Sequence, residues 1–361
     1  MWKKYGHKTL VICLGLVLLL GGSVRAAAGE ISLQEAIDRA LQESLEFKIA
    51  QVEWENARIA HQKAAADNLL TQSAYNQRLA ELDLLRAEKA YKNSIADVVI
   101  SAVQKFSDVN TAQMNLKISE EQLRLKQKAR DLTEKKLEMR NASEYDLMQA
   151  EAALASSRME YQAAVNNLEE KKQAFWLLTN SQDVMPDGKL PFVPFEAELA
   201  GILPGLLEAS VDIKEAEDSL ALSRLNLERL RLEETAELTM REAENAVRLA
   251  ELRLQQARAS LTQQAQAAFN AVRQAEQTYR ARQISLQLEQ RVYDITKGQV
   301  QAGLKTEDDL SNAQISLWQA ERSVYEALSS YIVAYLQWEN LIGKDVRDSV
   351  ILQPVDAGAE G

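Results

Sequence analysis

The residues of this chain that could do chemistry gather in two short segments with one pattern. Each segment has a hydroxyl residue, an aspartate three positions later and then a leucine: Ser143, Asp146 and Leu147 in the first, and Thr306, Asp309 and Leu310 in the second. A Ser or Thr side chain at such a place accepts a hydrogen bond from a backbone N–H at a helix start, and acids in the first turn interact favourably with the helix dipole. The first explanation of these residues is therefore helix capping.

The second segment also has the residues of a sharp turn. It extends on both sides of Thr306 with Gly303, Leu304, Lys305, Glu307 and Asp308. Glycine takes the left-handed backbone conformation without a steric cost, so Gly303 predicts a turn between two helices. In the first segment Arg140 occupies the place of this glycine, and we expect Asn141 to take the left-handed position instead.

Catalysis has no support in the sequence. Both Cys13 and His7 lie in an N-terminal stretch with the pattern of an export signal, which leaves His61 as the only other histidine. There is no glycine-rich phosphate loop and no group of histidines and acids at metal-ligand spacing. The remaining acids alternate with Lys and Arg as they do on solvated helix faces. We therefore expect no enzyme, no cofactor and no metal.

The composition favours long helices in an exported protein. The 361 residues include only 5 Pro and 13 Gly, and 26% of them are charged. A net charge of −11 argues against nucleic acid as a partner, since that needs a basic face. Lys3, Lys4 and Lys8 precede an apolar run at 10–20 and small residues at 26–28, which predicts a cleaved signal peptide over 1–28 rather than a retained anchor. The run is shorter than the roughly 20 residues that span a bilayer.

After this leader the chain divides into two similar halves. We expect helices at 44–66, 74–139 and 144–178 in a first repeat (31–180), and at 209–234, 241–302 and 306–342 in a second (209–345). The Pro- and Gly-rich stretch 181–208 predicts a linker, and 346–361 a flexible tail. Two shorter helices beside one long helix in each half predict a rod of about 95 Å.

The helices themselves have the pattern of coiled coils. Ile118, Leu125, Leu132 and Met139 recur every seven residues and predict a buried seam on the first long helix. Phe175 and Trp338 occupy matching places in the two halves, and we expect them in the core rather than in a ligand cage. The fold class is therefore all-α: long antiparallel hairpins in two tandem repeats, half of a coiled-coil-like α-barrel, with little or no β-structure.

Several loose motifs, in order and duplicated, carry a family resemblance. They are the Ser-Leu-x-x-Ala opening at 32–36, the Ser-x-(Asp/Glu)-x-Lys-x-Ala helix starts at 44–50 and 210–216, the Gly-Leu-x-Thr-x-x-Asp-Leu turn at 303–310, and the closing segments 178–180 and 341–343. With these motifs the chain resembles the TolC-like outer-membrane efflux proteins over residues 31–345.

The resemblance implies an efflux duct with partners. In that family three chains form a twelve-stranded barrel in the outer membrane, continued by a helical duct whose tips meet a periplasmic adaptor (membrane fusion) protein and an inner-membrane pump. Each family repeat inserts a β-hairpin where this chain has only 67–73 and 234–240, too short for two strands of about 9 to 11 residues. We therefore expect a homotrimeric duct without its own β-barrel pore, in an envelope that lacks an ordinary outer membrane or beside a protein that completes the pore.

The same resemblance gives the two segments a second explanation, as tips that dock the adaptor or gate the duct. Three copies would place Asp309 in a ring that selects cations or binds basic groups, and Lys305 of one tip would meet Asp146 of the other. Capping and docking are compatible. The alternative function is a non-conducting coiled-coil structural or adaptor protein of the envelope.

Overall fold

The structure is a computed structural model that describes residues 29–71, 74–182, 184–233 and 236–347. Its helices are α1 (Leu33–Glu43), α2 (Leu45–Thr71), α3 (Ala74–Glu138), α4 (Glu144–Thr179), α5 (Leu199–Ala209), α6 (Val211–Leu232), α7 (Glu237–Gln301) and α8 (Glu307–Leu341). Within these ranges the strands are β1 (Glu30–Ile31) and β2 (Met185–Pro186), which pair in parallel. The predicted all-α class is confirmed, while the leader and residues 348–361 lie outside the described part of the chain.

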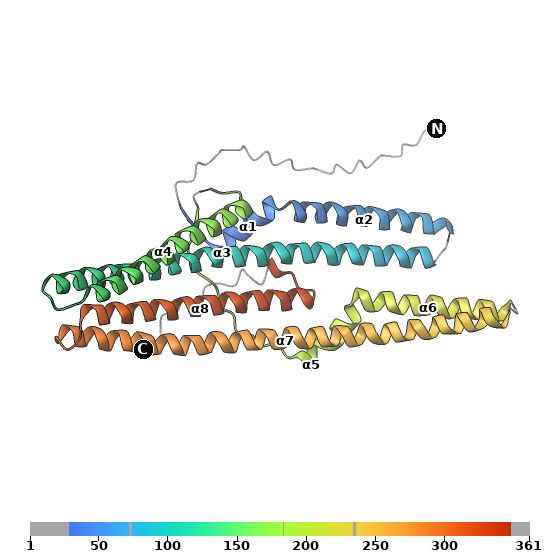
Figure 1. Cartoon of the computed structure of the whole chain (residues 1–361). Coiled ribbons are helices and arrows are strands. Elements are labelled where there is room, and N and C mark those ends of the chain that lie inside the picture. The colour runs from blue at the N-terminus through green and yellow to red at the C-terminus, as the bar shows by residue number, and fades with distance from the viewer. Residues whose placement is uncertain (1–28, 72–73, 183, 234–235, 348–361) are drawn as a thin grey trace, which may run out of the picture.

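Each repeat is built on one long helix. Both α3 and α7 have 65 residues, which is about 98 Å of helix at 1.5 Å per residue. The shorter helices α2 and α4 pack along successive parts of α3, and α6 and α8 do the same along α7 (Figure 1). The predicted arrangement is therefore confirmed, including the return between α6 and α7, for which the sequence offers no strong breaker.

Serine hydroxyls define the starts of the shorter helices. Each accepts a hydrogen bond from the backbone N–H three residues later: Ser32 Oγ from Glu35 at 3.3 Å, Ser44 Oγ from Phe47 at 3.1 Å, and Ser210 Oγ from Ile213 at 3.4 Å. Such a bond satisfies one of the N–H groups that a helix leaves without a partner at its first turn. Because the bond is local, these boundaries follow from the sequence.

An aromatic core lies where the two repeats meet. Phe175 and Trp338 are completely buried, as the sequence predicts. Phe195, from the segment before α5, contacts Trp338 edge to face with ring centres 5.9 Å apart. Between α3 and α8, the Asn110 side chain donates a hydrogen bond to the Tyr325 hydroxyl at 2.8 Å. The core therefore joins α3, α8 and the segment between the repeats at the middle of the rod.

The predicted seam on α3 is correct only in part. Ile118 is buried, but Leu132 and Met139 are 50% and 63% exposed. A strict seven-residue spacing drifts by about 20° per heptad around a straight α-helix, so later members leave the packed face. In addition, α3 continues to Glu138, ten residues past Lys128, which pairs with Asp308 at the start of α8.

Candidate functional site

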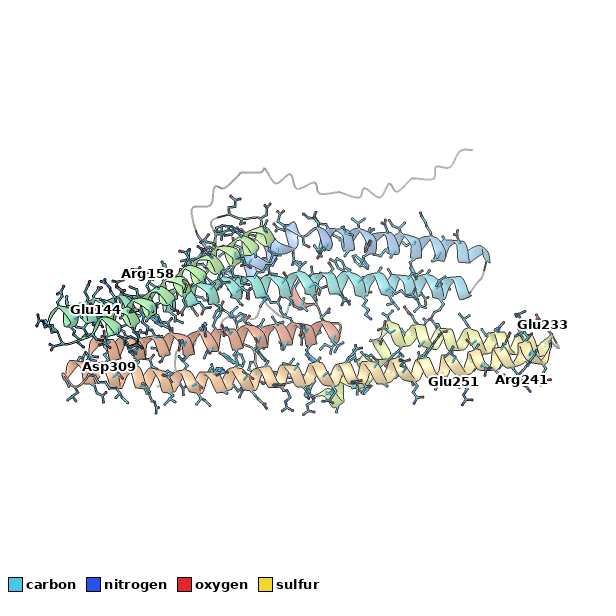
Figure 2. The ribbon with its side chains drawn as sticks, viewed as in Figure 1. Glu144, Arg158, Glu233, Arg241, Glu251 and Asp309 are labelled. Atoms are coloured by element: carbon cyan, nitrogen blue, oxygen red, sulfur yellow. The ribbon has the colours of Figure 1, made fainter. Side chains whose placement is uncertain are left out.

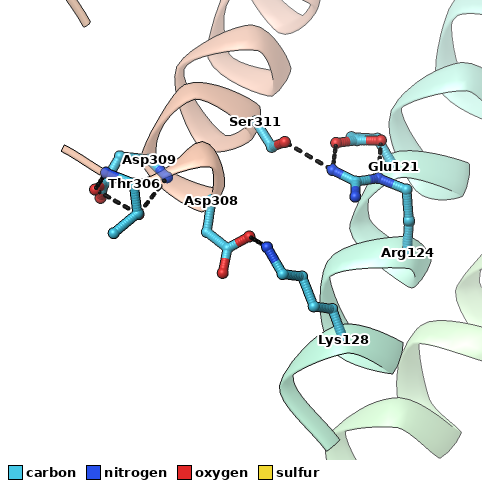
Figure 3. Close-up of polar contacts among 7 residues, drawn as sticks. All are labelled: Glu121, Arg124, Lys128, Thr306, Asp308, Asp309 and Ser311. Atoms are coloured by element: carbon cyan, nitrogen blue, oxygen red, sulfur yellow. Dashed lines mark hydrogen bonds and ion pairs between the residues drawn. The ribbon is translucent and has the colours of Figure 1, made fainter. Parts of the chain in front are cut away.

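The two segments singled out by the sequence form the tips of the hairpins α3–α4 and α7–α8. At the first tip, Ser143 Oγ accepts from the Asp146 N–H at 3.2 Å, and Asp146 Oδ2 accepts from the Ser143 N–H at 2.8 Å. At the second, Thr306 Oγ1 accepts from the Asp309 N–H at 3.2 Å, and Asp309 Oδ2 accepts from the Thr306 N–H at 2.9 Å (Figure 3). Both are complete capping boxes, so the capping prediction is confirmed.

These boxes keep both aspartates ionised. The hydrogen bond from the Thr306 side chain, together with that from its backbone and the nearby Lys305 charge, lowers the pKa of Asp309 below its ordinary value. Backbone and side-chain hydrogen bonds from Ser143 lower the pKa of Asp146 in the same way. Each carboxylate thus holds its own helix start and remains a negative charge at the tip.

The backbone turns of the two tips are alike, although their sequences differ. Gly303 has φ 71° and Arg140 has φ 57°, and the N–H of each bonds to a carbonyl three residues back, at 2.9 Å in both tips. The next residue bonds five residues back, from Asn141 to Lys136 and from Leu304 to Gln299. This pair of bonds is the Schellman motif, in which the residue whose N–H bonds three residues back has the left-handed conformation. That residue is Arg140 in the first tip and Gly303 in the second. The expectation that Asn141 takes that conformation is therefore wrong, because Arg140 holds it.

Polar contacts between α3 and α8 join the two repeats near the tips. Lys128 Nζ lies 2.6 Å from Asp308 Oδ1, and Arg124 Nη2 donates to Ser311 Oγ at 2.7 Å (Figure 3). Further from the tips, the Lys117 ammonium lies 4.0 Å from the centre of the Trp318 ring. Sequence reasoning missed all three basic residues. Their spacing of seven and four places them on one face of α3, and this pattern was the available signal.

The structure does not bring the predicted residues of the two tips together. Among the described residues, no ion pair joins Lys305 to Asp146, which the sequence placed opposite each other. The partner of the second tip is instead Lys128, well inside α3. Gly303, Leu304, Lys305, Thr306 and Asp309 are exposed, as are Ser143 and Asp146, whereas Asp308, Leu147 and Leu310 are partly buried.

Two stripes of exposed apolar side chains run along the hairpins at helical spacing. One lies on α2 and comprises Leu45, Ile49, Val52 and Ile59, which are 41–72% exposed. The other lies on the tip half of α7 and comprises Ile284, Leu288, Val292 and Ile295, which are 41–69% exposed. Each set occupies a single helix face, so each forms an apolar strip that remains exposed among the described residues.

No helix within the described ranges combines the length and the apolar character needed to cross a membrane. The same residues contain no group of three or more His, Cys, Asp or Glu arranged to hold a metal ion. The charged side chains lie along the helix surfaces, as Arg241 and Glu251 near one end of the rod illustrate (Figure 2). Arg241 pairs with Glu237, and Glu251 pairs with Arg224.

Comparison with known proteins relates the chain to outer membrane channels by structure alone. No protein-family model matches the sequence, and the comparison with curated proteins gives no match either. Among solved structures, the outer-membrane channel OprN has a TM-score of 0.59 at 16% identity, covering 87% of this chain and 90% of that one. The Campylobacter jejuni CmeC outer membrane channel has a TM-score of 0.58 at 16% identity, covering 86% and 85%. The Vibrio cholerae outer membrane protein VceC has a TM-score of 0.56 at 16% identity, covering 86% and 96%.

These likenesses concern the fold. They extend over most of both chains in each case, so this chain shares the fold of these outer membrane proteins. The resemblance to the TolC-like proteins that the sequence motifs indicate is thereby confirmed at the level of the fold.

Proposed function

We propose that the protein is a component of a TolC-like efflux or export duct. In this proposal three copies assemble into an α-helical conduit in the cell envelope, exported to the periplasm and associated with the outer membrane. The tips at 140–147 and 303–310 dock a periplasmic adaptor, which connects the duct to an inner-membrane pump. The fold, shared over most of the chain with outer membrane channels, supports the transport class.

The pair of exposed apolar stripes is the observation that supports assembly into a trimer. They lie on different repeats and in opposite halves of the rod, on α2 and on the tip half of α7 (Figure 1). A thin rod of helices cannot fold back to bury such strips, and large uncovered apolar surfaces on a protein mark contacts with other molecules. Copies of the chain placed side by side would cover both stripes along the length of the rod.

One observation favours the alternative, a non-conducting structural or adaptor protein. Only two residues separate Thr71, the end of α2, from Ala74, the start of α3. Four residues separate α6 from α7. These returns have no room for a pair of membrane-spanning strands, each of which needs about 9 to 11 residues. In our proposal the duct therefore relies on another protein, or on an envelope of different construction, for passage across an outer membrane.

Electron microscopy and mass measurement of the purified chain test the assembly. We expect a hollow ring of three copies about 100 Å long. Ile49→Glu should convert it to monomers, because a charge in the α2 stripe resists burial between copies. Gln51→Glu adds the same charge to an exposed position outside the stripe and should leave the ring intact. A wild-type monomer or a solid bundle would exclude the duct.

A transport measurement separates the duct from the structural alternative. Cells that produce the Ile49→Glu variant in place of the wild type should accumulate an exported substrate, whereas the Gln51→Glu variant should export normally. If the wild type forms rings and Ile49→Glu abolishes them without changing export, the structural role is favoured.

A further inference from the structure

The first tip stands apart from the second because α3 continues after α8 has begun. Asp308 is the second residue of α8, and it pairs with Lys128, ten residues before the end of α3 at Glu138. Those ten residues amount to about 15 Å of helix. Figure 3 shows α3 running on past Lys128, away from the start of α8. The end of α3 and the first tip therefore lie beyond this ion pair between the two repeats.

This first tip is apolar at its surface. Met139, Tyr145 and Met148 are 63%, 70% and 63% exposed, and they lie within ten residues of chain on both sides of the turn. The second tip exposes one large apolar side chain, Leu304, among Lys305 and three acids. Methionine adapts its flexible side chain to irregular apolar surfaces, and methionine and tyrosine are both enriched at protein interfaces. The two tips thus offer different chemistry to a partner.

The turn of the first tip adds a cation at a conformational cost. Arg140 has φ 57°, a conformation that costs a residue with a side chain roughly 1–2 kcal/mol, whereas the matching residue of the second tip is Gly303. Strained backbone of this kind is concentrated at functional sites. Within the described part of the chain, no ion pair involves the Arg140 guanidinium. The strained turn residue is therefore also a cation without an ion-pair partner among the described residues, and it lies between Met139 and the start of α4.

We propose that the first tip is the docking head of the protein, and that it binds an apolar surface of a partner protein bearing a carboxylate for Arg140. This inference rests on the proposed function and assigns partner docking to Met139, Arg140, Tyr145 and Met148. It narrows the proposed function, in which both tips dock, by giving the second tip mainly the role of holding the repeats in register through Asp308 and Lys128.

The local charge favours a protein surface over an anionic membrane. Residues 135–146 contain three bases, Lys135, Lys136 and Arg140, and three acids, Glu138, Glu144 and Asp146. A segment with no net charge gains little from a diffuse negative surface, which attracts by accumulated basic charge. A single carboxylate within an apolar surface, by contrast, can pair with one guanidinium while the methionines and the tyrosine are buried.

Matched single-cysteine variants test which tip docks. In a Cys13→Ser background the chain has no other thiol. Glu144→Cys and Glu307→Cys place a thiol at the first residue of α4 and of α8, both exposed and both outside the proposed patch. Each variant is produced as the full chain in cells of the source organism and labelled with a benzophenone maleimide. After illumination, the cross-linked peptides are sequenced by mass spectrometry.

We expect Glu144→Cys to cross-link to one protein, at an apolar peptide containing Asp or Glu, with at least about fivefold higher yield than Glu307→Cys. Adding Arg140→Glu should lower that yield about tenfold, the equivalent of 1.4 kcal/mol. Exchanging the acid of the cross-linked peptide for Lys should then restore it. A matched charge reversal outside both tips, Lys297→Glu at an exposed position of α7, should leave the yield unchanged. Equal yields from the two tips, adducts to lipid, or indifference to Arg140→Glu would each overturn the proposal.

The Arg140→Gly variant tests whether cross-linking is lost because the tip fails to fold. Glycine suits the turn conformation, so this variant should fold and assemble as the wild type does, yet lose cross-linking at the first tip. Electron microscopy of the same samples separates the two proposals. Rings whose cross-links come from the second tip would refute the docking head alone, whereas an Arg140-dependent cross-link without rings would refute the duct alone.

Discussion

Replacing Arg140 by glycine should slow local opening of the first tip, whereas replacing Gly303 by alanine should speed opening of the second. Both residues occupy the left-handed position of the same Schellman turn. A β-carbon added at Gly303 meets no heavy atom within 4 Å, so that substitution tests the backbone conformation without a steric clash. The pair therefore isolates one physical effect at two equivalent places.

The expected magnitude is the difference between two opposing terms. Relief of the left-handed conformation at Arg140 (φ 57°) stabilises the tip by about 1–2 kcal/mol. Glycine also gives the unfolded chain more freedom, which costs about 0.4–1 kcal/mol. The net gain is about 0.5–1 kcal/mol, and Gly303→Ala should lose a similar amount. By the tenfold-per-1.4 kcal/mol rule, amide exchange should change about two- to fivefold.

Native-state hydrogen exchange of the tip amides is the suitable assay, because long helical hairpins open locally and a global melting temperature averages over them. The amides of residues 136–147 should exchange more slowly in Arg140→Gly, and those of 299–310 faster in Gly303→Ala. Asn141→Gly is the control and should bring no protection, since Asn141 does not hold the positive φ. Faster exchange in Arg140→Gly, or a gain in Asn141→Gly, would refute the reasoning.

Three further predictions concern the core and the caps. Trp338→Ala, in the buried joint, should lower the free energy of unfolding by about 3–5 kcal/mol in chemical denaturation, whereas Leu177→Ala, at an 83% exposed side chain, should change it little. The pKa of Asp309 in the folded protein lies below its ordinary value of 3.8. The stabilisation from this carboxylate should therefore be complete above pH 3.8 and disappear as the pH falls through the folded pKa. Hydrogen exchange of the second tip's amides in Asp309→Asn should lack this acid dependence. Burial raises the pKa of Tyr325 to about 12, so its phenol should stay neutral in ultraviolet titration up to about pH 11, and Tyr325→Phe, which removes the hydrogen bond to Asn110, should cost about 1 kcal/mol.

Local chemistry made most of the helices predictable. The expected long helix at 74–139 is α3 (Ala74–Glu138), and the expected one at 306–342 is α8 (Glu307–Leu341). The starts of α4 and α8, at Ser143 and Thr306, follow from hydrogen bonds that span three residues, and such bonds depend on sequence alone. Phe175 and Trp338 were also identified as core residues, because the repeat places two large aromatic side chains at equivalent positions.

The contacts between helices were not predictable in the same way. The sequence suggests a contact of Lys305 with Asp146, whereas the ion pair between the repeats near the tips, in the described residues of one chain, joins Asp308 to Lys128 along α3. Nothing local in either helix sets this offset, which depends on how α3 and α8 pack along their whole length, from Asn110 and Tyr325 to Arg124 and Ser311.

The sequence by itself determined the elements of this protein: two repeats, four helices beside two long ones, and a capped turn at each tip. The tertiary structure decided how α3 and α8 are offset along the rod and which apolar faces stay exposed. It also decided that Arg140 rather than Asn141 takes the left-handed backbone conformation at the turn. The physical reason is one of range. A capping bond or an apolar period is contained in a few neighbouring residues, whereas helix offset and exposure arise from contacts between residues far apart in the chain.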